Sequence, residues 1–212
     1  MNYSFIKFIR GDETKKILVV LAIVLLIPVS IFANSLFSVT VGATAAYQKT
    51  GALESMANGE FDFEELSLQD FKTGLDVGVR ILFVEANGKA FFTETTDGDS
   101  AFNGIVSANL VFDFAIVRFK AGIGYQYLFN LSTEDVVYGS IVQKTDFEDF
   151  KDANLDLYVG IDLMLGGLVV NAYVTMPTTA TLNNASMDEL FAIADGGWKT
   201  AQIGVGIGFS LI

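Results

Sequence analysis

The stretch ANLDLYVGIDLMLGGLVVNAYVTM, residues 153–176, contains two alternating patterns joined by the pair Gly166-Gly167. Within residues 155–165 every odd position is apolar, and most even positions are small, polar or charged, including Asp156 and Asp162. After the two glycines the apolar residues move to the even positions. Because side chains alternate between the two faces of a β-strand, the stretch predicts an antiparallel hairpin with one apolar and one polar face.

The same period of two recurs along most of the chain. The other alternating segments are 36–47, 74–84, 90–96, 102–114, 117–129 and 199–211. The weakest of them, 90–96, depends on Asn87-Gly88 as the preceding tight turn, since Asn-Gly favours two-residue hairpins. The total of eight strands is an even number, which suits closure into an antiparallel barrel.

The connections between these strands are alternately long and short. Long acidic loops are expected near 48–73, 130–152 and 177–197, and tight turns are expected at the opposite strand ends. Residues 96–100 are an exception, because they form a short connection on the side of the long loops. Short turns on one side and long loops on the other are typical of bacterial outer-membrane barrels.

Two of the tight turns indicate how the apolar faces are arranged. In a two-residue hairpin the residues that flank the turn pair and share a face of the sheet. Leu165 and Leu168 flank one turn, Phe114 and Val117 flank another, and all four belong to their apolar sets. A soluble barrel would turn such a face inward. Aspartates on the other face fit a polar lumen surrounded by lipid, so the sequence predicts an all-β, eight-stranded antiparallel up-and-down transmembrane β-barrel with a lipid-facing apolar exterior.

Aromatic residues on the apolar face lie near the strand ends, whereas valine, alanine, isoleucine and leucine fill the middles. This distribution matches the aromatic girdles at the two membrane interfaces. The residues expected to face lipid are Phe37, Tyr47, Phe83, Phe112, Phe119, Tyr125, Tyr127 and Phe209.

The polar face carries charged residues that need partners inside a barrel. Asp113 should lie directly across a hairpin from Arg118, with Asp162 nearby on the next strand. The residues expected in this lumen ionic network are Asp76, Arg80, Asp113, Arg118, Lys120, Asp156 and Asp162. A salt-bridge network that fills the lumen is the favoured interpretation, because eight strands leave an interior that side chains just fill. A selectivity site for a permeant is the alternative.

Residues 1–33 have the layout of a secretory signal peptide: a basic start, an apolar stretch from Ile17 and a small residue, Ala33, before Asn34. A retained anchor helix is the alternative, but the stretch is short and contains Pro28. Cleavage would leave residues 34–212 as the mature barrel. It would remove four basic and two acidic residues, so the net charge would fall from −12 to −14. Such a charge disfavours nucleic acid as a partner.

The predicted architecture resembles the small eight-stranded outer-membrane proteins of diderm bacteria, the group that includes OmpX, the OmpA membrane domain, the opacity-type proteins and OmpW. The C-terminal sequence QIGVGIGFSLI is similar to the barrel-assembly signal of this group at Gln202, Gly204, Ile207 and Phe209. It departs from the pattern by ending on Ile212 instead of an aromatic residue. The resemblance implies an outer-membrane location, with membrane lipid and the barrel-assembly machinery as partners.

Catalysis has little support in the sequence, which contains no histidine and no cysteine. Barrels of this kind that modify lipid A or cleave proteins use a histidine, so we expect no enzyme, no catalytic residue, no metal site and no cofactor. The expected function is a structural or surface-interaction role for the acidic loops. Divalent cations or extracellular ligands are candidate partners at these loops. The alternative is an OmpW-like channel for small hydrophobic solutes.

Overall fold

The computed structural model describes residues 37–47, 51, 55–56, 58–60, 70–95, 97–141 and 143–211. The expected signal peptide, residues 1–33, lies outside the described residues. Eight long strands form the barrel: β1 (Phe37–Tyr47), β2 (Phe71–Ile81), β3 (Val84–Glu94), β4 (Ser100–Phe114), β5 (Val117–Asn130), β7 (Asn154–Leu165), β8 (Leu168–Thr181) and β9 (Gln202–Ser210). Each of them alternates between buried and more exposed residues.

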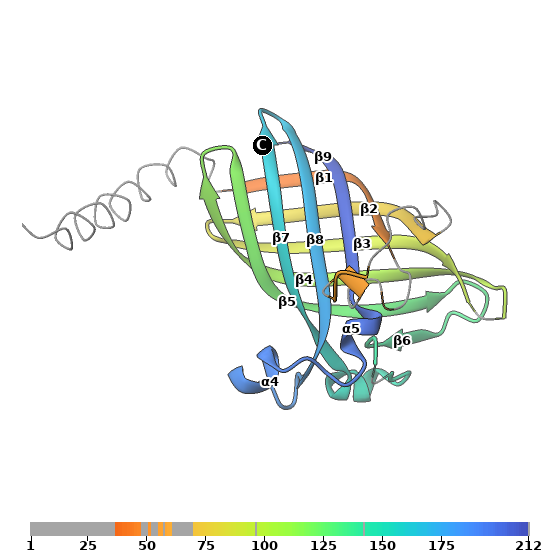
Figure 1. Ribbon diagram of the computed structural model, residues 1–212. Helices are drawn as coiled ribbons and strands as arrows, with labels where there is room; N and C mark the ends of the chain where they lie inside the picture. Colours follow the sequence, from red (N-terminus) through yellow and green to blue (C-terminus); the bar gives the residue numbers. More distant parts are fainter. Residues whose placement is uncertain are drawn as a thin grey trace, which may run out of the picture.

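These eight strands close into a ring in which every neighbouring pair is antiparallel (Figure 1). Strands next to each other in sequence are paired, and the first strand, β1, pairs with the last, β9. The short strand β6 (Val136–Tyr138) adds to the loop end of β5, beyond the part of β5 that pairs with β7. The prediction of a closed eight-stranded up-and-down barrel is therefore confirmed.

The two ends of the barrel differ in the length of their connections. Two-residue turns at 82–83, 115–116 and 166–167 lie at the turn end. The opposite, loop end carries β6, the 3-10 helix η3 (Phe147–Asp152) and the short helices α4 (Met187–Phe191) and α5 (Gly197–Thr200) (Figure 1). Helix α4 begins with a capping box, in which the Ser186 side chain accepts a hydrogen bond from the Glu189 backbone N–H and the Glu189 side chain accepts one from the Ser186 backbone N–H.

The prediction of a turn at Asn87-Gly88 was wrong. The turn lies at residues 82–83, and Asn87 is an inward residue of β3 whose amide donates to Asp76. β3 is paired on both sides, with β2 from Val84 to Phe91 and with β4 over its whole length. These ladders outweigh the local preference of Asn-Gly for a turn, and Leu82 takes the positive φ of 58° that the tight turn requires.

The loop boundaries also shift. The loop expected near 177–197 begins later, because β8 continues through Pro177 to Thr181. A register shift between Asn154 and Asp156 on β7 lies opposite this proline, which has no N–H to donate to the ladder. The third long connection therefore spans residues 182–201, the second spans 131–153, and the first ends where β2 begins at Phe71.

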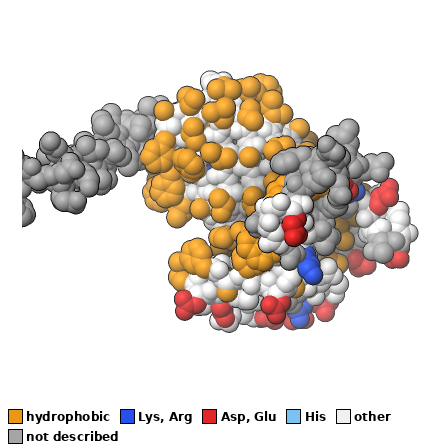
Figure 2. All heavy atoms as spheres, viewed as in Figure 1, with side chains coloured by type: hydrophobic (Ala, Val, Ile, Leu, Met, Phe, Trp, Pro, Cys, Tyr) orange, Lys and Arg blue, Asp and Glu red, His pale blue; other side chains and the backbone are white. Residues whose placement is uncertain are grey.

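The arrangement of polar and apolar side chains is the reverse of that in a water-soluble protein. The most exposed barrel positions are aliphatic or aromatic, and Figure 2 shows hydrophobic side chains over the barrel wall while charged side chains gather at the loop end. The buried charged residues are Asp76, Arg80, Glu85, Lys89, Asp113, Arg118, Lys120, Asp156 and Asp162. In the described part of the chain, no helix is long and apolar enough to cross a membrane.

Candidate functional site

A chain of ion pairs fills the turn end of the lumen. Asp113 lies opposite Arg118 in the β4–β5 ladder and accepts hydrogen bonds from Arg80 Nη1 at 2.5 Å and Arg118 Nε at 2.8 Å. Arg118 Nη1 also lies 4.0 Å from Glu85 Oε2. Lys120 Nζ lies 2.7 Å from Glu85 Oε1 and 2.8 Å from Asp162 Oδ2. Five strands thus contribute to one connected cluster.

A second pair lies beside this cluster. Lys89 Nζ is 2.5 Å from Asp76 Oδ2, and Asp76 also accepts hydrogen bonds from Asn87 and Asn171. The structure therefore places six of the seven residues of the expected network in ion pairs. The sequence analysis missed Glu85 and Lys89, because the expected turn at Asn87-Gly88 left both residues outside the predicted strands 74–84 and 90–96. Continuing the inward alternation from Glu85 through Asn87 would have found Lys89.

Asp156, the seventh expected member, does not join these ion pairs. It lies at the loop end of the lumen and accepts a hydrogen bond from the Gln126 side chain, with Ser140 Oγ at 3.3 Å and Asn154 Nδ2 at 3.4 Å. Among the described residues, the other eight buried charged side chains are four cations and four anions, and each of them has an ion-pair partner. Asp156 is a ninth charged group without a cation.

An apolar layer separates the ion pairs from the loop end of the lumen. It consists of the buried side chains Ala46, Phe91, Ile105, Tyr158 and Tyr173. The rings of the two tyrosines stack with centroids 5.7 Å apart, and Lys89 Nζ lies 4.5 Å from the centre of the Tyr173 ring. Position 204 has to be glycine here, because a Cβ atom would lie 2.1 Å from the Tyr173 ring.

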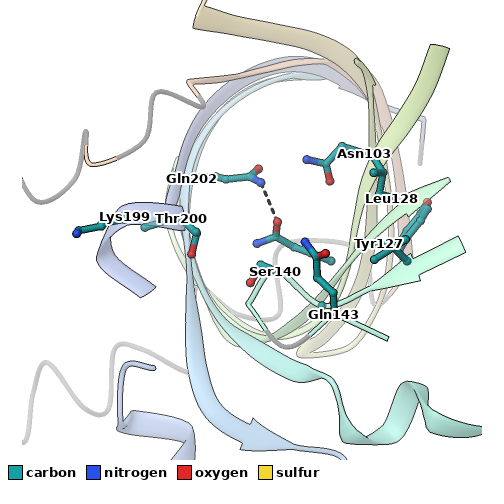
Figure 3. A pocket seen from close by; sticks show the side chains of 12 residues that line it. Asn103, Tyr127, Leu128, Ser140, Gln143, Lys199, Thr200 and Gln202 are labelled. Carbon is teal, nitrogen blue, oxygen red and sulfur yellow. Dashed lines mark hydrogen bonds between the residues drawn. The ribbon is translucent and has the colours of Figure 1, made fainter. Parts of the chain in front are cut away.

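A pocket opens above this layer, at the mouth of the barrel (Figure 3). Its volume is about 270 Å³, and its polar lining includes Asn103, Gln126, Ser140, Gln143, Lys199, Thr200 and Gln202. The Lys199 side chain extends away from the lumen (Figure 3). Gln202 reaches into the lumen from β9 and donates a hydrogen bond to Gln126 Oε1 at 2.8 Å (Figure 3). Both glutamines occupy polar positions of the alternating segments 117–129 and 199–211, but the pocket also needs Ser140 and Gln143. These come from a loop whose course no alternating pattern predicts.

The expected lipid-facing aromatics fall into three groups. Phe37, Phe112, Phe119 and Phe209 are exposed on the outer wall, and Phe83 is exposed in the tight turn at residues 82–83. Tyr125 and Tyr127 are half-buried, because Tyr125 packs against Phe150 of η3 and the Tyr127 ring lies against Gly104. The expectation for Tyr47 was wrong: it is only 5% exposed, and its ring packs 5.1 Å from that of Phe71.

The described residues contain no group of three or more side chains that could hold a metal ion together. Divalent-cation binding by the acidic loops stays a prediction, and part of the first loop, residues 61–69, lies outside the described residues.

No protein-family model and no curated protein matches the sequence. Among solved structures, the chain is similar to Ail, the attachment invasion locus protein of Yersinia pestis, whose structure was determined in complex with the heparin analogue sucrose octasulfate. The identity is 13%, the TM-score is 0.40, and the match covers 82% of this chain and 97% of Ail. Neisserial surface protein A is similar with 12% identity, a TM-score of 0.40 and the same two coverages. The eight-stranded architecture itself rests on the strand pairings.

Proposed function

We propose that this chain is a bacterial outer-membrane protein whose barrel spans the membrane and whose loop end faces the exterior. The observation that carries the proposal is the inverted burial, with an apolar outer wall around a lumen that holds nine charged side chains of the described residues. Water would favour the opposite arrangement, whereas hydrocarbon requires an apolar wall with every backbone group paired inside it. A closed barrel provides that pairing.

Within the membrane, we favour surface interaction or envelope support over solute passage or catalysis. The ion pairs and the apolar layer occupy the lumen between the turn end and the pocket. Side chains that fill the lumen in this way support a barrel through which solutes do not pass. The alternative, an OmpW-like channel for small hydrophobic solutes, would require such a solute to pass the charged turn end, where desolvated ions offer it no favourable contact.

Planar-bilayer recordings test the closed lumen. We expect the refolded protein to insert without producing reproducible single-channel conductance. The double variant Tyr158→Ala, Tyr173→Ala, which removes the two stacked rings, is the matched control. It should fold less stably and still not conduct, because the ion pairs at the turn end remain in place. Conductance from this variant alone would show that the apolar layer, and not the ion pairs, closes the lumen. Steady conductance from the parent protein would contradict the proposal and favour the channel.

The loop end offers a surface that suits contact with other molecules. Phe147 on η3 is 72% exposed and Phe191 on α4 is 66% exposed, and Trp198 on α5 is exposed as well. Acidic residues flank these apolar groups, with Glu148 beside Phe147 and Glu189 in α4. Exposed aromatic residues are enriched in binding surfaces, and the acidic surroundings favour a partner with basic groups.

Replacing Phe147 and Phe191 together by serine tests this role. We expect the variant to fold normally, because both side chains are exposed, and to lose most of the binding of barrel-bearing vesicles to extracellular matrix or cultured cells. Phe83→Ser is the matched control, since Phe83 is also exposed but lies in a tight turn at the opposite end. Equal binding by all three proteins, or no binding by the parent, would argue against surface interaction through these residues.

A further inference from the structure

The loop end of the lumen holds a buried carboxylate that no described cation neutralises. Asp156 is fully buried, and the described lysine and arginine residues of the lumen are engaged with Asp76, Glu85, Asp113 and Asp162 instead. The groups that surround Asp156 are neutral amide and hydroxyl donors. A buried charge satisfied only by neutral groups raises the affinity of its surroundings for a cation.

Asp156 also fixes the orientation of two amide side chains. An ionised carboxylate can only accept hydrogen bonds, so Gln126 turns its NH₂ group toward Asp156 and its carbonyl oxygen toward Gln202. Gln202 donates its own NH₂ group to that oxygen. Gln202 is only 6% exposed, and its remaining polar atom, Oε1, is buried. In the described part of the chain this oxygen has no hydrogen-bond partner.

Gln202 lines the pocket at the barrel mouth, and its unpaired Oε1 is covered, so a ligand reaches this acceptor when the amide group turns toward it (Figure 3). Because an unpaired buried acceptor is unfavourable, the pocket favours a ligand that brings a hydrogen-bond donor. The volume of about 270 Å³ suits a small molecule. Leu128, Val137 and Ala201 add apolar surface beside the amides, which fits a ligand with a polar head and a short hydrocarbon part.

We propose that this pocket binds the ammonium group of a small primary amine. Gln202 Oε1 accepts one N–H of the ammonium, and the carboxylate of Asp156, acting through Gln126, supplies the compensating negative charge. A neutral alcohol would satisfy the acceptor but not the charge, and a quaternary ammonium would satisfy the charge but not the acceptor. The acidic residues of η3 and α4 at the loop end raise the local concentration of such cations.

Three ligands with the same butyl chain separate these contributions: butylammonium, 1-butanol and butyltrimethylammonium. Binding is measured by titration calorimetry with the full refolded protein at about pH 8, where carboxylates are ionised and alkylamines protonated. Protein-free micelles serve as the blank. Fluorescence of Trp198, the single tryptophan, gives a second readout, because the neighbouring Lys199 lines the pocket. We expect saturable binding of butylammonium and at least about tenfold weaker binding of the other two, the effect of losing one interaction with a charged group.

Two variants test the residues independently. Asp156→Asn removes the charge, and Gln202→Met removes the acceptor while keeping the length of the side chain. Each should weaken butylammonium binding by about tenfold or more. Thr175→Val is the matched control, because Thr175 also has a buried oxygen without a partner but does not line the pocket. It should leave binding unchanged.

Other outcomes would overturn the proposal. Equal binding of butyltrimethylammonium would indicate diffuse attraction by the acidic loops, and equal binding of 1-butanol would indicate a neutral site. Absence of saturable binding would exclude the site altogether. Gel migration of the unheated sample verifies folding, and Gln202→Met decides the question where Asp156→Asn does not fold. None of these measurements depends on whether the barrel conducts or adheres.

Discussion

Replacing Asp113 with alanine is expected to destabilise the barrel by about 3–5 kcal/mol, or to prevent its folding, because removal of one partner leaves a buried charge uncompensated. Asp113 is the shared partner of Arg80 and Arg118. Without it, Arg118 retains Glu85 at 4.0 Å, but among the described residues Arg80 retains only the Leu82 carbonyl oxygen. The measurement is urea unfolding in lipid vesicles, followed by the heat-modifiable migration of the folded barrel.

Two further variants make this result specific. Ser107→Ala removes a neutral inward hydroxyl from the same strand and should cost about 1 kcal/mol, the usual effect of one neutral hydrogen bond. Adding Arg80→Leu to Asp113→Ala should recover part of the loss, because the unpaired cation disappears with its partner. Equal urea midpoints for Asp113→Ala and the parent would show that water screens these charges, and would therefore contradict the closed lumen.

The same cluster shows what the sequence could predict. The pairing of Asp113 with Arg118 follows from one reliable turn, because residues at equal distances from a two-residue hairpin share a face and lie opposite each other. No such anchor existed for β3. The Asn-Gly signal placed its turn five residues too late, and this single error hid Glu85 and Lys89. Register errors therefore propagate to every residue of a strand, whereas errors in a loop boundary remain local.

The pocket could not be predicted for a different reason. Gln126 and Gln202 lie on strands that are far apart in sequence, and they meet only because closure of the barrel brings β5 and β9 to face each other across the lumen. The wall formed by Ser140 depends on Asn154, whose side-chain oxygen accepts from the backbone N–H groups of Ser140 and Ile141. Such a contact between a loop and a strand end leaves no periodic signal in the sequence.

The orientation of the barrel wall leads to the second large effect, which concerns Ile161. The outward apolar positions of β7 are Leu157, Val159, Ile161, Leu163 and Leu165, so Ile161 lies in the middle of the band. We expect Ile161→Arg to destabilise the protein in lipid vesicles by about 2–4 kcal/mol, the cost of an arginine at the midplane of a membrane-spanning barrel. The cause is the transfer of a guanidinium group into hydrocarbon.

Leu165→Arg provides the matched comparison, because Leu165 shares the strand and the face of Ile161 but adjoins the tight turn. An arginine near the interface costs only about 0–1 kcal/mol, since its charged group reaches water and headgroups. In a protein surrounded by water, both positions would be ordinary surface sites, where substitutions change stability by about 0.5 kcal/mol or less. Equal and small effects at the two positions would therefore mean that no acyl chains surround the wall. A large effect at Ile161 alone would place that wall in a bilayer. The buried charged side chains would then be confined to the lumen, where they pair with one another.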